Sequence, residues 1–153
     1  MGSYEEILGE TLLSKDGFLP TTDTLNDRRY VALYFAAAWC PNCALFNPKL
    51  EKFYNWINKD IKEFEVILVS GDDDEQSFRD YYETQPWLSI KWDKEILQDI
   101  FVHYDATSMP LLVLIDRKGE IKSKKLKQDI ELKGNGVFES MKIEFPSPTK
   151  EMY

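Results

Sequence analysis

The strongest constraint on the fold is an apolar run from Val31 to Ala36 that leads, four residues later, into a Cys-Pro-Asn-Cys motif. A run without polar alternation predicts a β-strand that is covered on both faces, at the centre of a sheet. Pro41 suits the first turn of a helix, because its missing N–H is not needed there. The chain is therefore expected to pass from a buried strand into a helix between Cys40 and Cys43.

Other segments fit an alternation of strands and helices. Apolar residues spaced four, three and four apart predict one buried face on the helix after Pro41 (Phe46, Leu50, Phe53 and Ile57). Strands are also expected at 64–69 and 111–115, helices after 72–75 and at 94–104, an edge strand from 121, and two short strands around the Asp-Gly turn within 12–20. This order predicts an α/β fold: a mixed central sheet flanked by helices on both faces, with an added N-terminal β-hairpin.

Composition and charge narrow the class of protein. With 153 residues, 43% of them apolar, the chain is long enough for a single domain over 1–153, with a core at about 12–127 and no assignment for the tail after 134. The net charge of −8 argues against non-specific binding to nucleic acid or anionic membranes. No stretch approaches the roughly 20 apolar residues of a membrane span, and 1–13 lacks the pattern of a secretory signal. We therefore expect a monomeric, cytoplasmic protein.

The chain has only two cysteines, and they stand three residues apart. Cys40 precedes the predicted helix, whose unpaired N–H groups favour a thiolate, so we assign it as the attacking nucleophile. Cys43 lies one turn into the helix on the same face, and its expected task is to resolve the mixed disulfide. Trp39 would form a flat apolar wall beside the pair. The pair predicts thiol–disulfide exchange in a reducing compartment.

Three other uses of the cysteines stay open. One is half of a zinc site, although a complete site usually has four ligands and the chain offers a single histidine, His103. Another is a permanent structural disulfide, which would close only a small loop and stabilise little. The third is a metal or iron–sulfur site shared by two chains through Cys40 of each. We assign no metal ligand, and His103 is expected to be a surface or half-buried structural residue.

Met109-Pro110 stands directly before the apolar run at 111–115. If the peptide bond is cis, it can present the backbone of its neighbour to a substrate beside the cysteines. The alternative is a proline that starts a strand, and periodicity does not separate the two.

Two charged runs are interpreted as solvent-exposed segments. The acidic run at 72–75 is expected to be a solvated helix cap, because it lacks the glycine and glutamate spacing of a calcium loop. The basic cluster at 122–127 is expected to be the exposed face of an edge strand. Trp87 could fill the core or rim a partner groove.

Several motifs stand in an order that matches a known family. The motif at 39–43 follows a buried strand, and Met109-Pro110 precedes a later one. Between them lie a segment at 46–50, an acidic stretch before Phe78 and Tyr82, and Pro86-Trp87-Leu88. In combination, from about 12 to 127, they resemble the tryparedoxin and nucleoredoxin branch of the thioredoxin-like superfamily.

The resemblance implies the thioredoxin fold and an oxidoreductase that reduces protein disulfides through a reversible Cys40–Cys43 pair. It also implies that Trp39, Pro41, Met109 and Pro110 lie around the substrate, with Pro110 as a cis-proline. Electrons would come from a low-molecular-weight dithiol or a flavoprotein reductase and pass to disulfide-containing proteins such as peroxiredoxins, with no bound cofactor. The nucleoredoxins imply an alternative: a redox-dependent protein-binding module with little turnover.

Three positions depart from the family pattern. The inner dipeptide is Pro41-Asn42, where Gly-Pro or Pro-Pro is commonest, so a thioredoxin-like reduction potential near ~−270 mV does not carry over. Ala44 follows Cys43, where the branch usually has Arg or Lys, so a positive charge is missing beside the pair. Tyr34 stands where ordinary thioredoxins bury an Asp, which leaves the proton acceptor for Cys43 unassigned.

Overall fold

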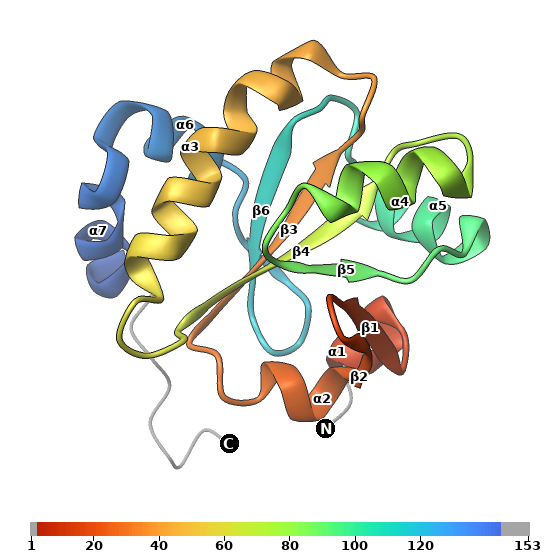
Figure 1. The fold of residues 1–153 in the computed structure, drawn as a ribbon. Helices are drawn as coiled ribbons and strands as arrows, with labels where there is room; N and C mark the ends of the chain where they lie inside the picture. Colours follow the sequence, from red (N-terminus) through yellow and green to blue (C-terminus); the bar gives the residue numbers. More distant parts are fainter. Residues whose placement is uncertain (1–2, 145–153) are drawn as a thin grey trace.

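A mixed β-sheet forms the centre of the molecule (Figure 1). The computed structural model describes residues 3–144, and within that range the sheet has seven strands. These are β1 (Thr11–Ser14), β2 (Gly17–Pro20), β3 (Tyr30–Ala36), β4 (Phe64–Ser70), β5 (Leu88–Ile90), β6 (Leu111–Ile115) and β7 (Ile121–Ser123). Their order across the sheet is β2-β1-β5-β4-β3-β6-β7, so β4 and β3 lie in the interior of the sheet.

The directions of the central strands bring the ends of three strands to one edge of the sheet. β3 pairs parallel with β4, and β4 pairs parallel with β5. β6 runs antiparallel to β3, with Val31 opposite Ile115 and Phe35 opposite Leu111. The carboxyl ends of β3 and β4 therefore lie beside the start of β6.

Helices cover both faces of the sheet (Figure 1). They are α1 (Ser3–Leu8), α2 (Thr21–Leu25), α3 (Pro41–Ile57), α4 (Glu75–Glu83), α5 (Lys94–His103), α6 (Leu126–Lys133) and α7 (Val137–Glu144), with a short 3-10 helix, η1 (Gly134–Gly136), between the last two. Side chains of α3, α4, α6 and α7 pack into one hydrophobic cluster, and those of α1, α2 and α5 into the other.

β3 shows how the sequence produces this two-sided core. All seven of its residues are buried, and alternate side chains enter opposite clusters. Ala32 and Tyr34 pack with α3, whereas Leu33 and Phe35 pack with α5. The continuous apolar run was needed because neither face of this strand reaches water. The predicted mixed sheet with helices on both faces is confirmed.

The predicted N-terminal hairpin is also confirmed. β1 and β2 pair antiparallel around a tight turn, with Ser14 opposite Gly17, and Gly17 has a φ of +114° that a residue with a side chain rarely adopts. β1 pairs with β5, so the hairpin extends the sheet. Lys15 fastens the hairpin to α4: its Nζ donates to the carbonyl of Tyr82 at 2.6 Å and lies 3.6 Å from the centre of that ring.

Some expectations need correction. The basic cluster at 122–127 is not one face of an edge strand, because β7 ends at Ser123 and α6 begins at Leu126, which is buried. Leu88 starts β5, a strand that was not among the predicted elements. Trp87 fills the core and does not rim a groove. α1, α6 and α7 had no counterpart among the predicted elements.

No helix in residues 3–144 has both the length and the apolar character needed to cross a membrane.

Candidate active site

The two cysteines lie where the central strands end. β3 finishes at Ala36, and Cys40 is the N-cap residue of α3, with an extended backbone. Because β3 and β4 are parallel, Ser70 and Gly71 reach the same edge of the sheet, and the antiparallel β6 brings Met109 and Pro110 there as well. Residues from three distant parts of the chain therefore surround the cysteines.

Cys40 and Cys43 are both free thiols in contact with each other. The Sγ of Cys40 accepts a hydrogen bond from the backbone N–H of Cys43 at 3.2 Å, so the cysteine itself caps the helix. A small part of Cys40 is exposed, 6%, whereas Cys43 has no accessible surface. Closing these two sulfurs into a disulfide needs no rearrangement of distant segments.

Burial sets the protonation state of Cys43. Burial, together with the hydrogen bond with Cys40, raises the pKa of the Cys43 thiol from 9.0 to about 12. The backbone of Ala37 acts in the opposite direction, and the nearby carboxylate of Asp72 adds to the rise. Cys43 is consequently a protonated thiol at neutral pH and must lose its proton before it can attack a disulfide.

Three hydrogen-bonded side chains, those of Tyr34, Asn47 and Tyr81, lie beneath the cysteines. The hydroxyl of Tyr34 on β3 donates to Oδ1 of Asn47 on α3. Nδ2 of Asn47 donates in turn to the hydroxyl of Tyr81 on α4 at 3.0 Å. Burial raises the pKa of Tyr81 to about 12, and burial raises the pKa of Tyr34 still further above the ordinary value of a phenol. Both hydroxyls therefore keep their protons at neutral pH.

Asp72 is part of the site, although the acidic run 72–75 was expected to be solvated. Its side chain is buried, with 6% of the residue exposed. Oδ1 accepts from the backbone N–H of Ala38 at 2.9 Å, and Oδ2 accepts from Oγ of Ser70 at 2.8 Å. The prediction holds for Asp74, which is exposed and caps α4 through the N–H of Ser77. The carboxylate of Asp72 thus ties the turn before the cysteines to the end of β4.

Trp39 stands beside the pair as an exposed ring, with 60% of the residue accessible. Its Nε1 donates to the carbonyl of Gly71 at 3.3 Å, which fixes the ring across the end of β4. Pro41 and Asn42, the two residues between the cysteines, are exposed as well. Ala44 is also exposed and supplies no charge.

Met109 and Pro110 complete the site from the opposite side. Their peptide bond is cis, and Pro110 is buried whereas Met109 is partly accessible. Met109 lies against Gly71: a Cβ at position 71 would come within 2.9 Å of the Met109 sulfur. A residue with a side chain at position 71 would therefore displace Met109.

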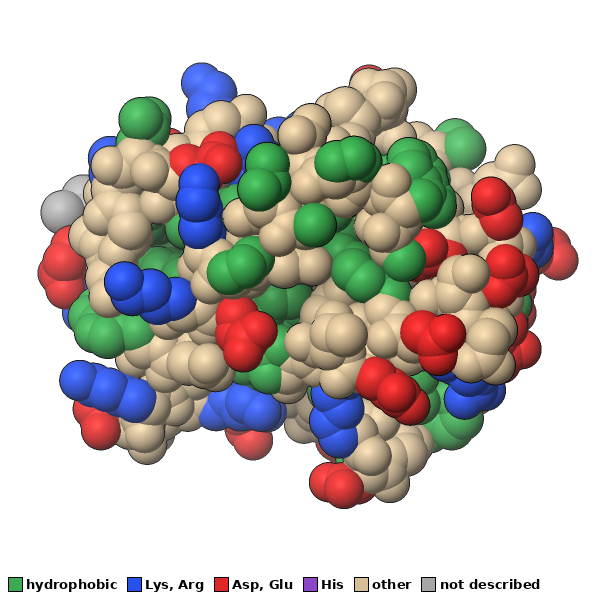
Figure 2. All heavy atoms as spheres, turned by 45° about the horizontal axis from the view of Figure 1, so that its top comes forward, with side chains coloured by type: hydrophobic (Ala, Val, Ile, Leu, Met, Phe, Trp, Pro, Cys, Tyr) green, Lys and Arg blue, Asp and Glu red, His purple; other side chains and the backbone are tan. Residues whose placement is uncertain are grey.

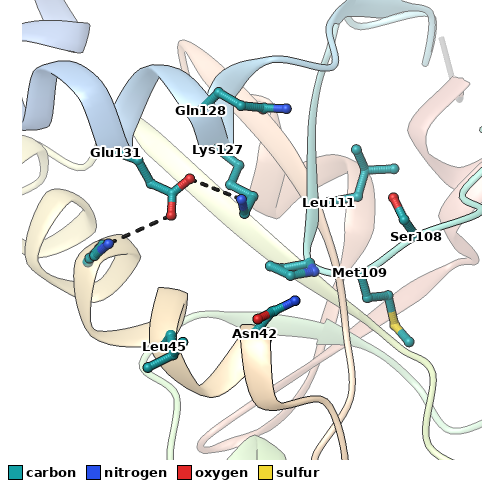
Figure 3. A pocket seen from close by; sticks show the side chains of 10 residues that line it. Asn42, Leu45, Ser108, Met109, Leu111, Lys127, Gln128 and Glu131 are labelled. Carbon is teal, nitrogen blue, oxygen red and sulfur yellow. Dashed lines mark hydrogen bonds and ion pairs between the residues drawn. The ribbon is translucent and has the colours of Figure 1, made fainter.

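A pocket of about 330 Å³ opens next to Pro110, between α3 and α6 (Figure 3). Glu131 on α6 forms ion pairs there with Lys127 at 3.0 Å and with Lys49 of α3 at 3.7 Å. Leu45 contributes an apolar wall and is 70% exposed. The pocket is lined by Asn42, Leu45, Lys49, Ser108, Met109, Pro110, Leu111, Lys127, Gln128 and Glu131.

Seen from the end of the molecule where α3 begins, hydrophobic side chains gather in the middle of the surface (Figure 2). Acidic side chains lie mainly on one flank of this area and basic ones mainly on the other. An apolar centre with polar flanks is typical of a surface that contacts another molecule.

His103 lies away from the cysteines. It is exposed at the end of α5, which agrees with the expected surface position, and it borders a separate pocket between α1 and α5. Among the described residues no group of three or more His, Cys, Asp or Glu side chains is arranged to hold a metal ion.

The structure brings together the six residues that the sequence suggested and adds others. Asp72, Asn47 and Tyr81 were not singled out as site residues. Asn47 could have been found, because it follows Cys43 by four residues and so shares its helix face. Asp72 and Tyr81 join the site only through the pairing of β3 with β4 and the packing of α4.

Comparisons with known proteins agree with this geometry. Residues 27–121, more than half of the chain, match a family model described as thioredoxin-like. The chain is 36% identical over 111 residues to probable nucleoredoxin 1 of Arabidopsis thaliana, covering 72% of this chain and 19% of that protein. It is 37% identical over 106 residues to the tryparedoxin of Trypanosoma brucei brucei, covering 69% of this chain and 72% of that protein.

A solved structure, tryparedoxin from Trypanosoma brucei, superposes with a TM-score of 0.80 at 31% identity and covers 96% of this chain and 99% of its own. The thioredoxin fold expected from the resemblance is thereby confirmed. The chain spans only about a fifth of the plant nucleoredoxin's length. With a matching family model over most of its length and tryparedoxin and nucleoredoxin relatives, the chain belongs to the thioredoxin-like family of oxidoreductases.

Proposed function

We propose that this protein reduces protein disulfides through reversible opening and closing of a Cys40–Cys43 disulfide. The observation that carries the proposal is the position of the two sulfurs. Cys40 caps a helix and has a small accessible surface, while Cys43 touches it from a fully buried position. One sulfur can meet a client, and the other can be reached only through the first.

The reaction then runs in two exchanges. The Cys40 thiolate attacks one sulfur of the client disulfide, the S–S bond breaks, and the other client sulfur leaves as a thiol after taking a proton. Cys43 loses its proton and attacks the Cys40 sulfur, which releases the second client thiol and closes the Cys40–Cys43 disulfide. Two electrons have moved from the dithiol to the client, and the protein is left oxidised.

Four residues are proposed to hold the client during these steps. Trp39 and Pro41 present exposed surface on one side of Cys40, and Met109 and Pro110 lie on the other side. The pocket beside Pro110 extends this surface towards α6. The client segment is proposed to lie against these residues in an extended conformation.

The electron donor is proposed to be an external low-molecular-weight dithiol or a flavoprotein reductase, and no bound cofactor is invoked. Peroxiredoxins and other disulfide-containing proteins are the proposed recipients, in the cytoplasm. The choice of donor and recipients is supported by the similarity to a tryparedoxin, and the two cysteines store one pair of electrons per cycle.

The first test is reduction of insulin disulfides with dithiothreitol as donor. Wild type should accelerate the reaction, and Cys40→Ser should lower its rate to that of dithiothreitol alone, because the accessible sulfur is lost. Equal rates for wild type and Cys40→Ser would remove Cys40 from the mechanism. Ser140→Ala on α7, outside the proposed client surface, serves as the control and should react like wild type.

The second test traps the intermediate. Cys43→Ser should accumulate a mixed disulfide between Cys40 and an oxidised partner, visible as a mass increase that dithiothreitol reverses. The outcome that contradicts the assignment is an adduct on Cys43 in Cys40→Ser without any adduct on Cys40 in Cys43→Ser. Such a result would reverse the two roles.

A second candidate function is a redox-dependent binding module of nucleoredoxin type. It is favoured by the identity to a plant nucleoredoxin in which this chain corresponds to a fraction of the length. A module of that kind would hold a client without turnover. Client capture that survives the loss of both thiols, together with negligible insulin reduction, would support this candidate over the reductase.

A further inference from the structure

We propose that Asn47 and Tyr81 are positioning residues that stabilise the charge formed on the Cys43 sulfur when the mixed disulfide is resolved. The inference rests on the proposed function, because it concerns the second exchange of that reaction. Nothing in the motif itself points to these two residues, which lie on different helices.

The hydrogen bonds around Asn47 determine which hydroxyl hydrogens are already bonded. The amide oxygen of Asn47 accepts the hydrogen of the Tyr34 hydroxyl, so that hydrogen is already bonded. The amide nitrogen donates to the Tyr81 oxygen at 3.0 Å. The Tyr81 hydroxyl therefore still has its own hydrogen to donate. Its bond to the Asn47 oxygen is long, at 3.3 Å. A hydroxyl hydrogen held only weakly can turn when a better acceptor forms nearby.

The thiolate of Cys43 is the acceptor that forms during this step. Asn47 follows Cys43 by one helical turn, so the two side chains share one face of α3. Cys43 and Tyr34 belong to the same hydrophobic cluster, and Tyr81 packs against it. Tyr81 is close enough to Cys43 for the charge on one to shift the ionisation of the other. A thiolate at this site would therefore lie within the field of the Tyr81 hydroxyl.

Four titratable groups face Cys43 from the surrounding elements. Cys40 lies at the start of α3, Tyr34 on β3, Tyr81 on α4, and Asp72 in the loop after β4. Asp72 opposes a thiolate through its charge, and the Tyr34 hydrogen is committed to Asn47. Of the two hydroxyls, that of Tyr81 has the longer bond from its own hydrogen to Asn47, at 3.3 Å, and it also shares a side-chain hydrogen bond with Tyr34, so its hydrogen is the less tightly held of the two.

The step then balances without a further reactant. Cys43 gives its proton to solvent, and its lone pair forms the bond to Cys40 while the client sulfur leaves with the electrons of the broken bond. The Tyr81 hydrogen turns towards Cys43 while its charge exists and returns when the disulfide closes. A hydrogen bond to a charged group in a low-dielectric site is stronger than one between neutral groups, so its loss slows this step in particular.

Stopped-flow reaction of the reduced protein with dithiobisnitrobenzoate separates the two exchanges. The first release of thionitrobenzoate depends on reagent concentration and reports attack by Cys40. The second release is independent of concentration and reports attack by Cys43. Tyr81→Phe should slow the second release by about tenfold and move its pH profile upward, with the first release unchanged. Asn47→Asp should slow the second release further, because a carboxylate would hold both tyrosine hydrogens and add a negative charge.

Tyr104→Phe is the control, because it removes another buried hydroxyl, bonded to the carbonyl of Gly119 on the opposite side of the sheet. It should leave both releases unchanged. Second releases in Tyr81→Phe and Asn47→Asp that match wild type in rate and pH profile would overturn the inference, as would an equal slowing by Tyr104→Phe. Absence of a second release in wild type would instead contradict the proposed function. Asn47→Gln, which keeps the amide, should recover part of the rate lost in Asn47→Asp.

Discussion

Asp72 shows how one side chain can influence the reaction without belonging to the motif. Its carboxylate holds the backbone of Ala38 and the hydroxyl of Ser70, and its charge raises the pKa of Cys43. The two effects act in different ways. The hydrogen bonds shape the turn that leads to the cysteines, whereas the charge works against the thiolate that the second exchange requires.

Asp72→Asn should separate these effects. The amide oxygen can still accept from Ala38, but the negative charge is gone, so the pKa of Cys43 should fall. We expect the concentration-independent release of thionitrobenzoate at neutral pH to become about two- to tenfold faster, with its pH profile moved downward. Asp73→Asn is the matched control, because that neighbouring carboxylate is exposed. A slower release in Asp72→Asn would mean that the carboxylate instead takes the proton of Cys43.

Some residues of the site could be placed from the sequence and others could not. Cys40 and Cys43 could be placed at a helix start because Pro41 and the preceding apolar run are local signals. Asp72 could not, since its neighbours 73–75 are solvated and only the end of β4 determines that its side chain turns inward. A run of identical charges hides one buried member whenever the decisive contact is distant in sequence.

At the scale of elements, α4 depends on the residue that precedes it. Asp74 is the N-cap, with Oδ1 accepting from the N–H of Ser77 at 2.8 Å and Oδ2 from its hydroxyl at 3.2 Å. The backbone and side chain of Ser77 also lower the pKa of Asp74. The helix carries Phe78 and Tyr82 into the core and Tyr81 to the cysteines.

Asp74→Ala should therefore lower the free energy of unfolding, because the first N–H groups of α4 lose an acceptor. Urea denaturation followed by tryptophan fluorescence measures the change. Asp73→Ala, which removes an exposed carboxylate one residue earlier, should change the stability by much less. Equal losses in the two variants would show that the effect is general charge and not capping.

The long, strongly patterned elements could be predicted and the short ones could not. β3, β4, α3 and α5 have apolar runs or helical spacing over most of their length. β5 has three residues, and its burial comes from pairing with β4 and β1. α6 has buried residues only at Leu126 and Ile130 among charged neighbours, so the local pattern resembles a solvated strand as much as a helix.

For the molecule as a whole, buried acids that keep their protons make stability depend on alkaline pH. Burial raises the pKa of Cys43 from 9.0 to about 12 and that of Tyr81 and Tyr104 from 10.0 to about 12. The folded state holds these protons more tightly than the unfolded chain does. The stability they contribute is fully present below pH 9.0 and is lost as the pH rises towards about 12.

We therefore expect the free energy of unfolding to be nearly constant from neutral pH to about 9 and to fall steeply from there to about 12. Urea denaturation at a series of pH values measures this curve. The free energy of unfolding of Tyr104→Phe should fall less steeply with pH than that of wild type. The substitution removes one of the buried acidic groups without touching the cysteines. A wild-type curve that stays flat up to about pH 12 would contradict the expectation.

The hairpin of β1 and β2 has a consequence for how the sheet ends. An unpaired strand at the rim of a sheet offers its backbone to any extended segment and can seed co-aggregation. The hairpin covers β5, and the new rim is the four-residue β2, which ends in a proline that has no N–H to donate. An extended segment of another chain thus finds little backbone to pair with on this flank.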